Sequence, residues 1–279
     1  MMNFERIDSK DNFEQLTLDK AFERAKNIIE KAEIQPEDFG DIYGADEIRD
    51  DIQYVERIEK RIEEQNTPEQ KKHKKLATVF EAIVHEHAEL SEWFGPDAET
   101  IKPSRYDDIK NGVDTIAELK EGGRSVTHLA MGIDVTFSVD AEKKFKRIKQ
   151  EIENGTLAEV KYFHSEYMEV RERLSNVPRV VIGADEKTIR ELSTLWLEGR
   201  KKELGNHPIQ FQILEEIADQ LKVYKAYAET VNQPGLAAMY EKVMRSVRDI
   251  RKKKGMAMKD SGARDSVFYT LEENLGIFK

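Results

Sequence analysis

Alternation of apolar and polar side chains is clearest between Tyr106 and Ser138, where it predicts two strands joined by a tight turn. The turn is expected at Gly122-Gly123, because glycine readily adopts the positive φ angles that short hairpins need. One set of alternate positions in the second strand is large and apolar: Leu129, Met131, Ile133, Val135 and Phe137. The other set is small or polar: Ala130, Gly132, Asp134, Thr136 and Ser138. Successive strand residues point to opposite faces, so we expect one face to pack on a core and the other to line a cleft.

Helical spacing of apolar residues predicts helices on both sides of this hairpin. A narrow apolar stripe predicts a helix over about 45–65, which Asn66-Thr67-Pro68 is expected to end. A broader stripe predicts a second helix over 74–94, which Gly95-Pro96 ends. The remaining predicted elements are a short strand near 100–106, a helix over 141–154, strands over 157–164 and 177–184, and helices over 186–204, 209–231 and 236–254.

These elements divide the chain into four parts. A helical N-terminal extension covers residues 1–72, and a mixed α/β core with a mixed central sheet covers 73–205. Helices follow over 206–254, and the tail over 255–279 has little periodicity. The tail is expected either to dock through Phe268, Tyr269 and Phe278 or to stay loose.

Composition excludes several classes of protein. The chain of 279 residues has no cysteine, which excludes disulfides, thiolate nucleophiles and cysteine-ligated zinc. No apolar run approaches the roughly 20 residues of a membrane span, and the first residues do not resemble a signal peptide, so a cytoplasmic location is expected. The net charge of −10 argues against coating nucleic acid by bulk electrostatics, although local basic clusters lie at 71–75, 143–149 and 245–254.

The strongest candidates for chemistry are two acids in the predicted hairpin. Asn111-Gly112-Val113-Asp114 leads into its first strand, and Asp134-Val135-Thr136 lies in its second. With the predicted order of helices and strands, these residues resemble the PD-(D/E)XK nuclease superfamily. The resemblance implies a restriction-endonuclease-like αβββαβ core. Two departures from the superfamily pattern are Val113, where proline is often found, and Thr136, where the motif lysine is expected.

The resemblance also implies a set of site residues. Asp114 and Asp134 would bind Mg²⁺ or Mn²⁺, because carboxylate oxygens suit these hard cations. A glutamate of the preceding helix would join them; Glu86 fits by helical angle and Glu81 by its position early in the helix. Thr136 occupies the catalytic lysine position, so Lys143 or Lys144 of the next helix would replace that lysine. The implied activity is hydrolysis of phosphodiester bonds in DNA or RNA, with DNA favoured.

A second hypothesis belongs to a different class of function. The missing lysine and the large helical share of the chain are also typical of a nuclease fold that has lost catalysis. Such a protein would act as a scaffold that binds nucleic acid, or a protein partner through its N-terminal helices. His85 and His87 do not form a zinc pair, because their spacing of two directs them to different sides of a helix. His87 lies within the apolar stripe, where a histidine is usually a core residue.

Overall fold

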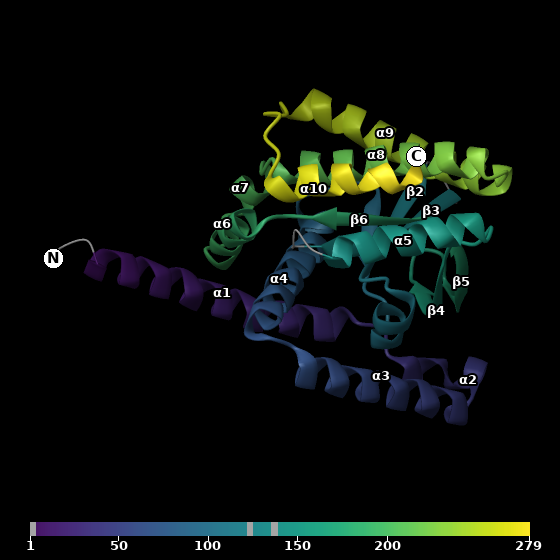
Figure 1. Cartoon of the computed structure of the whole chain (residues 1–279), viewed down its shortest axis with the longest axis horizontal. Coiled ribbons are helices and arrows are strands. Elements are labelled where there is room, and N and C mark those ends of the chain that lie inside the picture. Colours follow the sequence, from purple (N-terminus) through teal and green to yellow (C-terminus); the bar gives the residue numbers. More distant parts are fainter. Residues whose placement is uncertain (1–3, 122–124, 135–138) are drawn as a thin grey trace.

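A four-stranded mixed sheet lies at the centre of the computed structural model (Figure 1). The structure describes residues 4–121, 125–134 and 139–279, and side chains are discussed for residues 14–120, 126–132, 142–256 and 258–279. The strand order is β1-β2-β3-β6, with only β2 antiparallel to the others. The strands are β1 (Ala98–Ile101), β2 (Thr115–Glu121), β3 (Ser125–Asp134) and β6 (Arg179–Gly183). The predicted mixed α/β class is therefore confirmed.

Helices surround this sheet and extend from it at both ends of the chain (Figure 1). The N-terminal helices are α1 (Phe4–Ala32), a 3₁₀ turn η1 (Pro36–Phe39), α2 (Gly40–Tyr43), α3 (Ala45–Gln65) and α4 (Pro68–Leu90). The middle helices are the π-helical turn η2 (Asp107–Asn111), α5 (Val139–Glu153), α6 (Glu186–Leu197) and α7 (Lys201–Gly205). The C-terminal helices are α8 (Ile209–Thr230), α9 (Pro234–Ala257), α10 (Ser266–Asn274) and η3 (Leu275–Phe278). The predicted helical extensions are confirmed.

The two faces of the β2–β3 hairpin have different neighbours. Leu129 and Met131 join the main core, which α1, α4, α8 and α9 also line, as the predicted apolar wall requires. Ala130 points to the opposite face and packs with Ile116 against a separate β-hairpin. That hairpin consists of β4 (Ala158–Ser165) and β5 (Val170–Val177). The predicted Gly-Gly turn and the positions Val135, Thr136, Phe137 and Ser138 lie outside the described residues.

The predicted strand over 157–164 does not belong to the central sheet. It corresponds to β4, which pairs with β5, and no strand was expected at β5. The β5 segment Val-Arg-Glu-Arg-Leu-Ser-Asn-Val has few apolar residues, and most of its side chains are exposed, so it lacks the usual hydrophobic signal. The fourth strand of the sheet is β6, whose five residues are all buried.

Several predicted element ends were also wrong. Helix α3 ends just before Asn66-Thr67-Pro68, as predicted, but the next helix begins earlier than predicted. The Thr67 side chain accepts a hydrogen bond from Gln70 N in a capping box, so α4 begins at Pro68 rather than at residue 74. The first strand ends at Ile101, and residues 107–111 form η2 instead of strand. The helix predicted over 186–204 is divided at Gly199, whose φ of +67° interrupts it between α6 and α7.

Helix α8 completes the hydrogen bonding of β6. Gln220 pairs with both backbone groups of Val181: its Oε1 accepts from the N–H at 2.7 Å and its Nε2 donates to the C=O at 2.6 Å. One turn away, Glu216 Oε2 accepts from Gly183 N at 3.1 Å, and Gln212 Nε2 donates to Gly183 O at 3.2 Å. Side chains spaced by four residues thus satisfy a strand edge that would otherwise leave buried polar groups unpaired.

Candidate functional site

The candidate site lies where the chain enters β2. Asp114 immediately precedes β2, and its backbone N–H donates to Met131 O of β3 at 3.1 Å. The preceding Gly112 ends η2 with a φ of +64°, in the left-handed region that favours glycine. A Cβ at position 112 would lie 2.8 Å from Arg147 Nη1 and 3.0 Å from Arg179 Nη1. The left-handed backbone conformation therefore favours glycine directly before Val113 and Asp114.

A buried carboxylate holds this loop in place. The Asp107 side chain accepts hydrogen bonds from two backbone N–H groups of β4, Lys161 at 2.7 Å and Tyr162 at 3.0 Å. It also accepts from Ser104 Oγ at 2.8 Å and Asn111 Nδ2 at 2.7 Å. Burial raises the pKa of Asp107 even though these bonds favour its ionised form. Asp107 is thus a positioning residue that fixes the loop carrying Asp114.

Lys102 connects three acids around the start of β2. Its ammonium Nζ lies 2.6 Å from Glu81 Oε1 of α4 and 3.8 Å from Asp108 Oδ2 of η2. The same nitrogen donates a hydrogen bond to the backbone carbonyl of Asp114 at 3.0 Å. Only 3% of the Lys102 side chain is exposed, so its charge acts mainly on these neighbours.

The pKa values of the acids reflect this crowding. Burial raises the pKa of Glu81 to about 7, and the nearby charges of Asp114 and Asp108 add to that effect while Lys102 opposes it. Burial also acts on Asp108, but Lys102 and Arg105 outweigh it and hold the pKa of Asp108 below its usual value. The side chain of Asp114 also acts to lower the pKa of Asp108, so these two acids are close neighbours. Lys102 and Arg105 neutralise part of the negative charge of these acids.

Lys144 reaches the same place from α5. A Cβ built on Gly132 of β3 would lie 3.8 Å from Lys144 Cδ and 4.0 Å from Asp114 Oδ2. The lysine stem and the Asp114 carboxylate therefore lie together over Gly132, where a larger side chain would fill the space. Lys143, the alternative lysine, is exposed to solvent. Asp134 follows Gly132 by two residues in β3; its side chain and the whole of Thr136 lie outside the described residues.

The two candidate glutamates of α4 have different surroundings. Glu81 faces Lys102 and Asp114, as described above. Glu86 accepts hydrogen bonds from Arg24 Nη2 of α1, at 3.1 and 3.3 Å, and from Trp196 Nε1 of α6. Five residues along a helix rotate a side chain by roughly 140°, so the two cannot serve one site. The charge of Asp114 acts on Glu81, whereas Glu86 is bound by Arg24 and Trp196.

Three further residues of the cluster carry no clear signal in the sequence. Lys102 and Arg105 lie in a short loop after β1, where a lysine or arginine is usually solvated. Arg179, at the start of β6, donates to Gly112 O at 2.5 Å and forms an ion pair with Glu151 of α5 at 3.1 Å. These contacts join segments distant along the chain, so only the tertiary arrangement identifies them.

The donor set suits a hard divalent cation in its chemistry. Glu81 and Asp114 supply carboxylate oxygens, and the charged neighbour of Glu81 Oε1 is the Lys102 ammonium at 2.6 Å. Among the described residues, no group of three or more histidine, aspartate or glutamate side chains is arranged to hold a metal ion. The position that the resemblance assigns to a further ligand is Asp134, whose side chain is not among those described.

Comparisons with known proteins add no relative. Family models, curated proteins and solved structures were compared with this chain, and none of the three comparisons found a match. None of the helices over the described ranges is long and apolar enough to cross a membrane. The assignment of a function to this chain therefore rests on its own residues.

Proposed function

We propose that this chain is a metal-dependent nuclease that hydrolyses phosphodiester bonds of nucleic acid, with DNA favoured over RNA. One observation carries the proposal: Lys144 of α5 and Asp114 both lie about 4 Å from a Cβ built on Gly132, and the charge of Asp114 acts on Glu81 of α4. Two acids and a lysine at one edge of a sheet are the groups that metal-assisted phosphodiester cleavage needs.

The order of elements supports the same proposal. Helix α4 is followed by β1, β2 and β3, then by α5 and, after the β4–β5 hairpin, by β6. The sheet order β1-β2-β3-β6, with β2 antiparallel to the rest, fits the restriction-endonuclease-like αβββαβ core that the motif resemblance implies. In this interpretation the β4–β5 hairpin is an insertion.

The roles of the residues follow from their chemistry. When bound by Glu81, Asp114 and the acid at position 134, Mg²⁺ or Mn²⁺ supplies charge stabilisation for the phosphate and a means of activating water. Lys144 replaces the missing motif lysine and stabilises negative charge on the substrate, since its Cδ and Asp114 Oδ2 lie near the same position over Gly132. Lys102 and Asp107 position the carboxylates: the first offsets their charge and the second fixes the loop.

The test is cleavage of plasmid DNA, linear DNA and RNA by the purified chain in Mg²⁺ or Mn²⁺. Asp114→Asn and Lys144→Met should each reduce the rate by about 10²-fold or more, because each removes a charged group from the reaction site. Lys143→Met is the matched control, since this exposed neighbour is a lysine of the same helix, and it should keep the parent rate. Cleavage that persists in Asp114→Asn would exclude the proposed role.

One observation favours the alternative, a nuclease fold that binds without cutting. The Lys102 ammonium at 2.6 Å from Glu81 already neutralises part of the charge that a metal ion would neutralise. Thermal unfolding with and without Mn²⁺ separates the two functions. A metal site should raise the melting temperature of the parent and not of Asp114→Asn, whereas a scaffold should respond in neither protein.

A further inference from the structure

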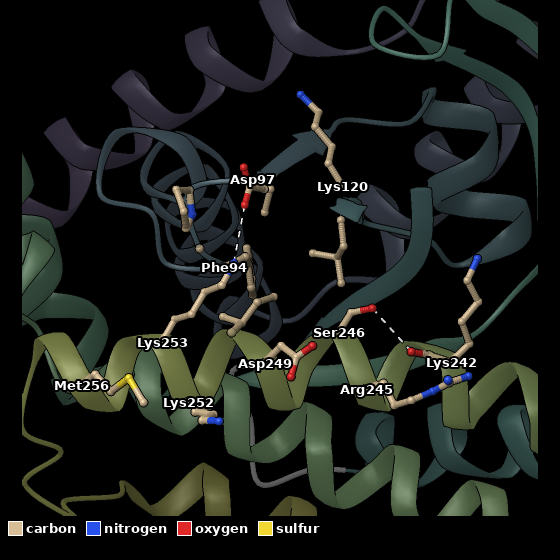
Figure 2. Close-up of a pocket in the computed structure, with 15 residues that line it drawn as sticks. Phe94, Asp97, Lys120, Lys242, Arg245, Ser246, Asp249, Lys252, Lys253 and Met256 are labelled. Atoms are coloured by element: carbon tan, nitrogen blue, oxygen red, sulfur yellow. Dashed lines mark hydrogen bonds and ion pairs between the residues drawn. The ribbon is translucent and has the colours of Figure 1, made fainter. Parts of the chain in front are cut away.

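A basic groove lies at the other end of the sheet from the candidate site. Helix α9, from Lys242 to Met256, forms one side, and the segment Phe94–Ala98 with the end of β2 forms the other (Figure 2). Its volume is about 800 Å³. The α9 segment rises by roughly 21 Å at 1.5 Å per residue, so the groove is long enough to hold about four turns of a second helix.

The charge of the groove is opposite to that of the chain. Five cationic residues line it, against the two acids Asp97 and Asp249: Lys120, Lys242, Arg245, Lys252 and Lys253. The chain as a whole carries a net charge of −10. Within the described residues, Arg245 and Lys252 make no ion pair, and both are exposed. Lys120 and Lys253 are paired with Glu99 and Asp97, so the positive charge that the groove offers to a negatively charged partner comes mainly from Arg245 and Lys252.

The floor of the groove is apolar. Leu119 of β2 and Phe94 come from the main core, and the half-buried Ile250 of α9 lies between the two sides. Gly95 has a φ of +93°, and a Cβ there would touch Ile250 Cγ1 at 3.4 Å, so the glycine keeps this part of the floor open. Met256 is 77% exposed at one end, where its flexible side chain can adapt to an apolar ligand.

The groove is separate from the candidate site. Asp114 precedes β2 and Leu119 lies near its end, about 17 Å further along at 3.3 Å per residue. The groove is therefore a surface distinct from the candidate site.

We propose that this basic groove docks an acidic amphipathic helix of a partner protein. The apolar stripe of such a helix would lie on the half-buried Ile250 and the exposed Met256, and its flanking carboxylates would meet Arg245, Lys252 and Lys242. The exposed rim, where Asp97 and Lys253 are each 65% exposed, makes the groove an open channel rather than an enclosed small-molecule cavity. The apolar floor favours a helix over nucleic acid, whose phosphates need only the cations. This inference is independent of the proposed nuclease activity.

The probe is a fluorescein-labelled synthetic peptide of about 15 residues, with leucine at positions i, i+3, i+4 and i+7 and glutamate elsewhere. Fluorescence anisotropy should give saturable binding that weakens as salt is raised. Exchanging two of the groove cations, by Arg245→Glu with Lys252→Glu, should weaken binding about tenfold, and Met256→Asp should also weaken it. These side chains are exposed, so the variants should fold normally.

The matched control is Arg248→Glu, an exposed arginine of α9 that does not line the groove. It should change the affinity by less than about twofold. Equal losses in Arg248→Glu and Arg245→Glu would overturn the proposal, as would equal binding of a peptide with the same composition and a scrambled leucine pattern. Binding of a labelled oligonucleotide through Arg245 and Lys252, without binding of the peptide, would assign the groove to nucleic acid instead.

Discussion

Lys102 is the residue on which the balance of charge in the candidate site depends. Its buried ammonium contacts Glu81 and lies near Asp108, and it donates to the backbone of Asp114. Removing one partner of a buried ion pair leaves the other charge uncompensated, which usually costs more than the pair contributes. The pKa of about 7 for Glu81 limits that cost, because this carboxyl can take up a proton. Lys102 therefore determines how much negative charge of these acids is left for another cation to neutralise.

We expect Lys102→Met to lower the free energy of unfolding by about 3 kcal/mol in metal-free buffer at neutral pH. Mn²⁺ should restore part of this loss, since the carboxylates then lack their internal counter-ion. Chemical denaturation with and without Mn²⁺ measures both effects. Lys143→Met, at an exposed position, should show neither. A Lys102→Met protein that is destabilised but indifferent to Mn²⁺ would contradict the proposed metal site.

His87 illustrates a residue whose environment, and not its type, determines its role. It is 2% exposed, forms a hydrogen bond with Ser91 Oγ at 2.7 Å and packs beside Trp93. Burial lowers the pKa of His87 from 6.5, with Glu86 opposing and Arg24 adding to the shift. The expectation of a core histidine in the apolar stripe is confirmed.

This lowered pKa predicts the direction of a pH effect. Between 6.5 and the folded-state pKa, the unfolded chain binds more protons than the folded chain, so stability falls as pH falls through this range. His87→Gln removes this contribution and should flatten the dependence. Urea denaturation at about pH 7 and about pH 5.5 compares the two proteins. An equally steep loss in His87→Gln would show that other groups cause it.

At the scale of elements, the periodicity of apolar residues predicted helix bounds better than the proline, glycine and capping residues did. The amphipathic stripe predicted α3 with its observed bounds, Ala45–Gln65. The start of α4 was missed because Thr67-Pro68 can end one helix or cap the next, and the capping box with Gln70 decides for the second. Strand β5 was missed because its pairing with β4, and not an apolar pattern, defines it.

The contact of α8 with β6 gives a prediction at this scale. Gln220→Leu should lower the free energy of unfolding by about 2–4 kcal/mol, because it leaves the buried N–H and C=O of Val181 without partners. The exposed Lys222→Ala in the same helix should change it by less than about 0.5 kcal/mol. Equilibrium denaturation measures both. A near-neutral Gln220→Leu would mean that β6 does not need α8 to satisfy its edge.

At the scale of the whole molecule, elements from both ends of the chain contribute to the core: α1 from Leu18 onward, and α10 with η3. Helix α1 lies along α4 and α6, and the C-terminal α10 and η3 pack on α5 and α8 (Figure 1). The tail docks through Phe268 and Phe278, which are buried, while Tyr269 is 55% exposed. Phe278 contacts the rings of Phe145, Tyr224 and Tyr227, so the last residues close the core over α5 and α8.

Two aromatic substitutions test this closure. Phe278→Ala should lower the free energy of unfolding by about 3 kcal/mol or more, because it removes a buried ring from a packed cluster. Tyr269→Ala, in the exposed position, should cost less than about 1 kcal/mol. Thermal and chemical unfolding compare them. Equal effects would contradict a tail that is anchored at Phe278.

The sequence by itself determined the fold class, the amphipathic helices and the two-faced β3, because periodicity reports directly which side chains must leave water. It also identified Asp114, Glu81 and Lys144 as candidates, although it left Glu86 and Lys143 equally open. The choice between them depends on helix rotation and on contacts across more than 20 residues of chain, which only the tertiary structure specifies. The same holds for Lys102 and for the basic groove, since burial and convergence of charge arise from distant segments that local patterns do not connect.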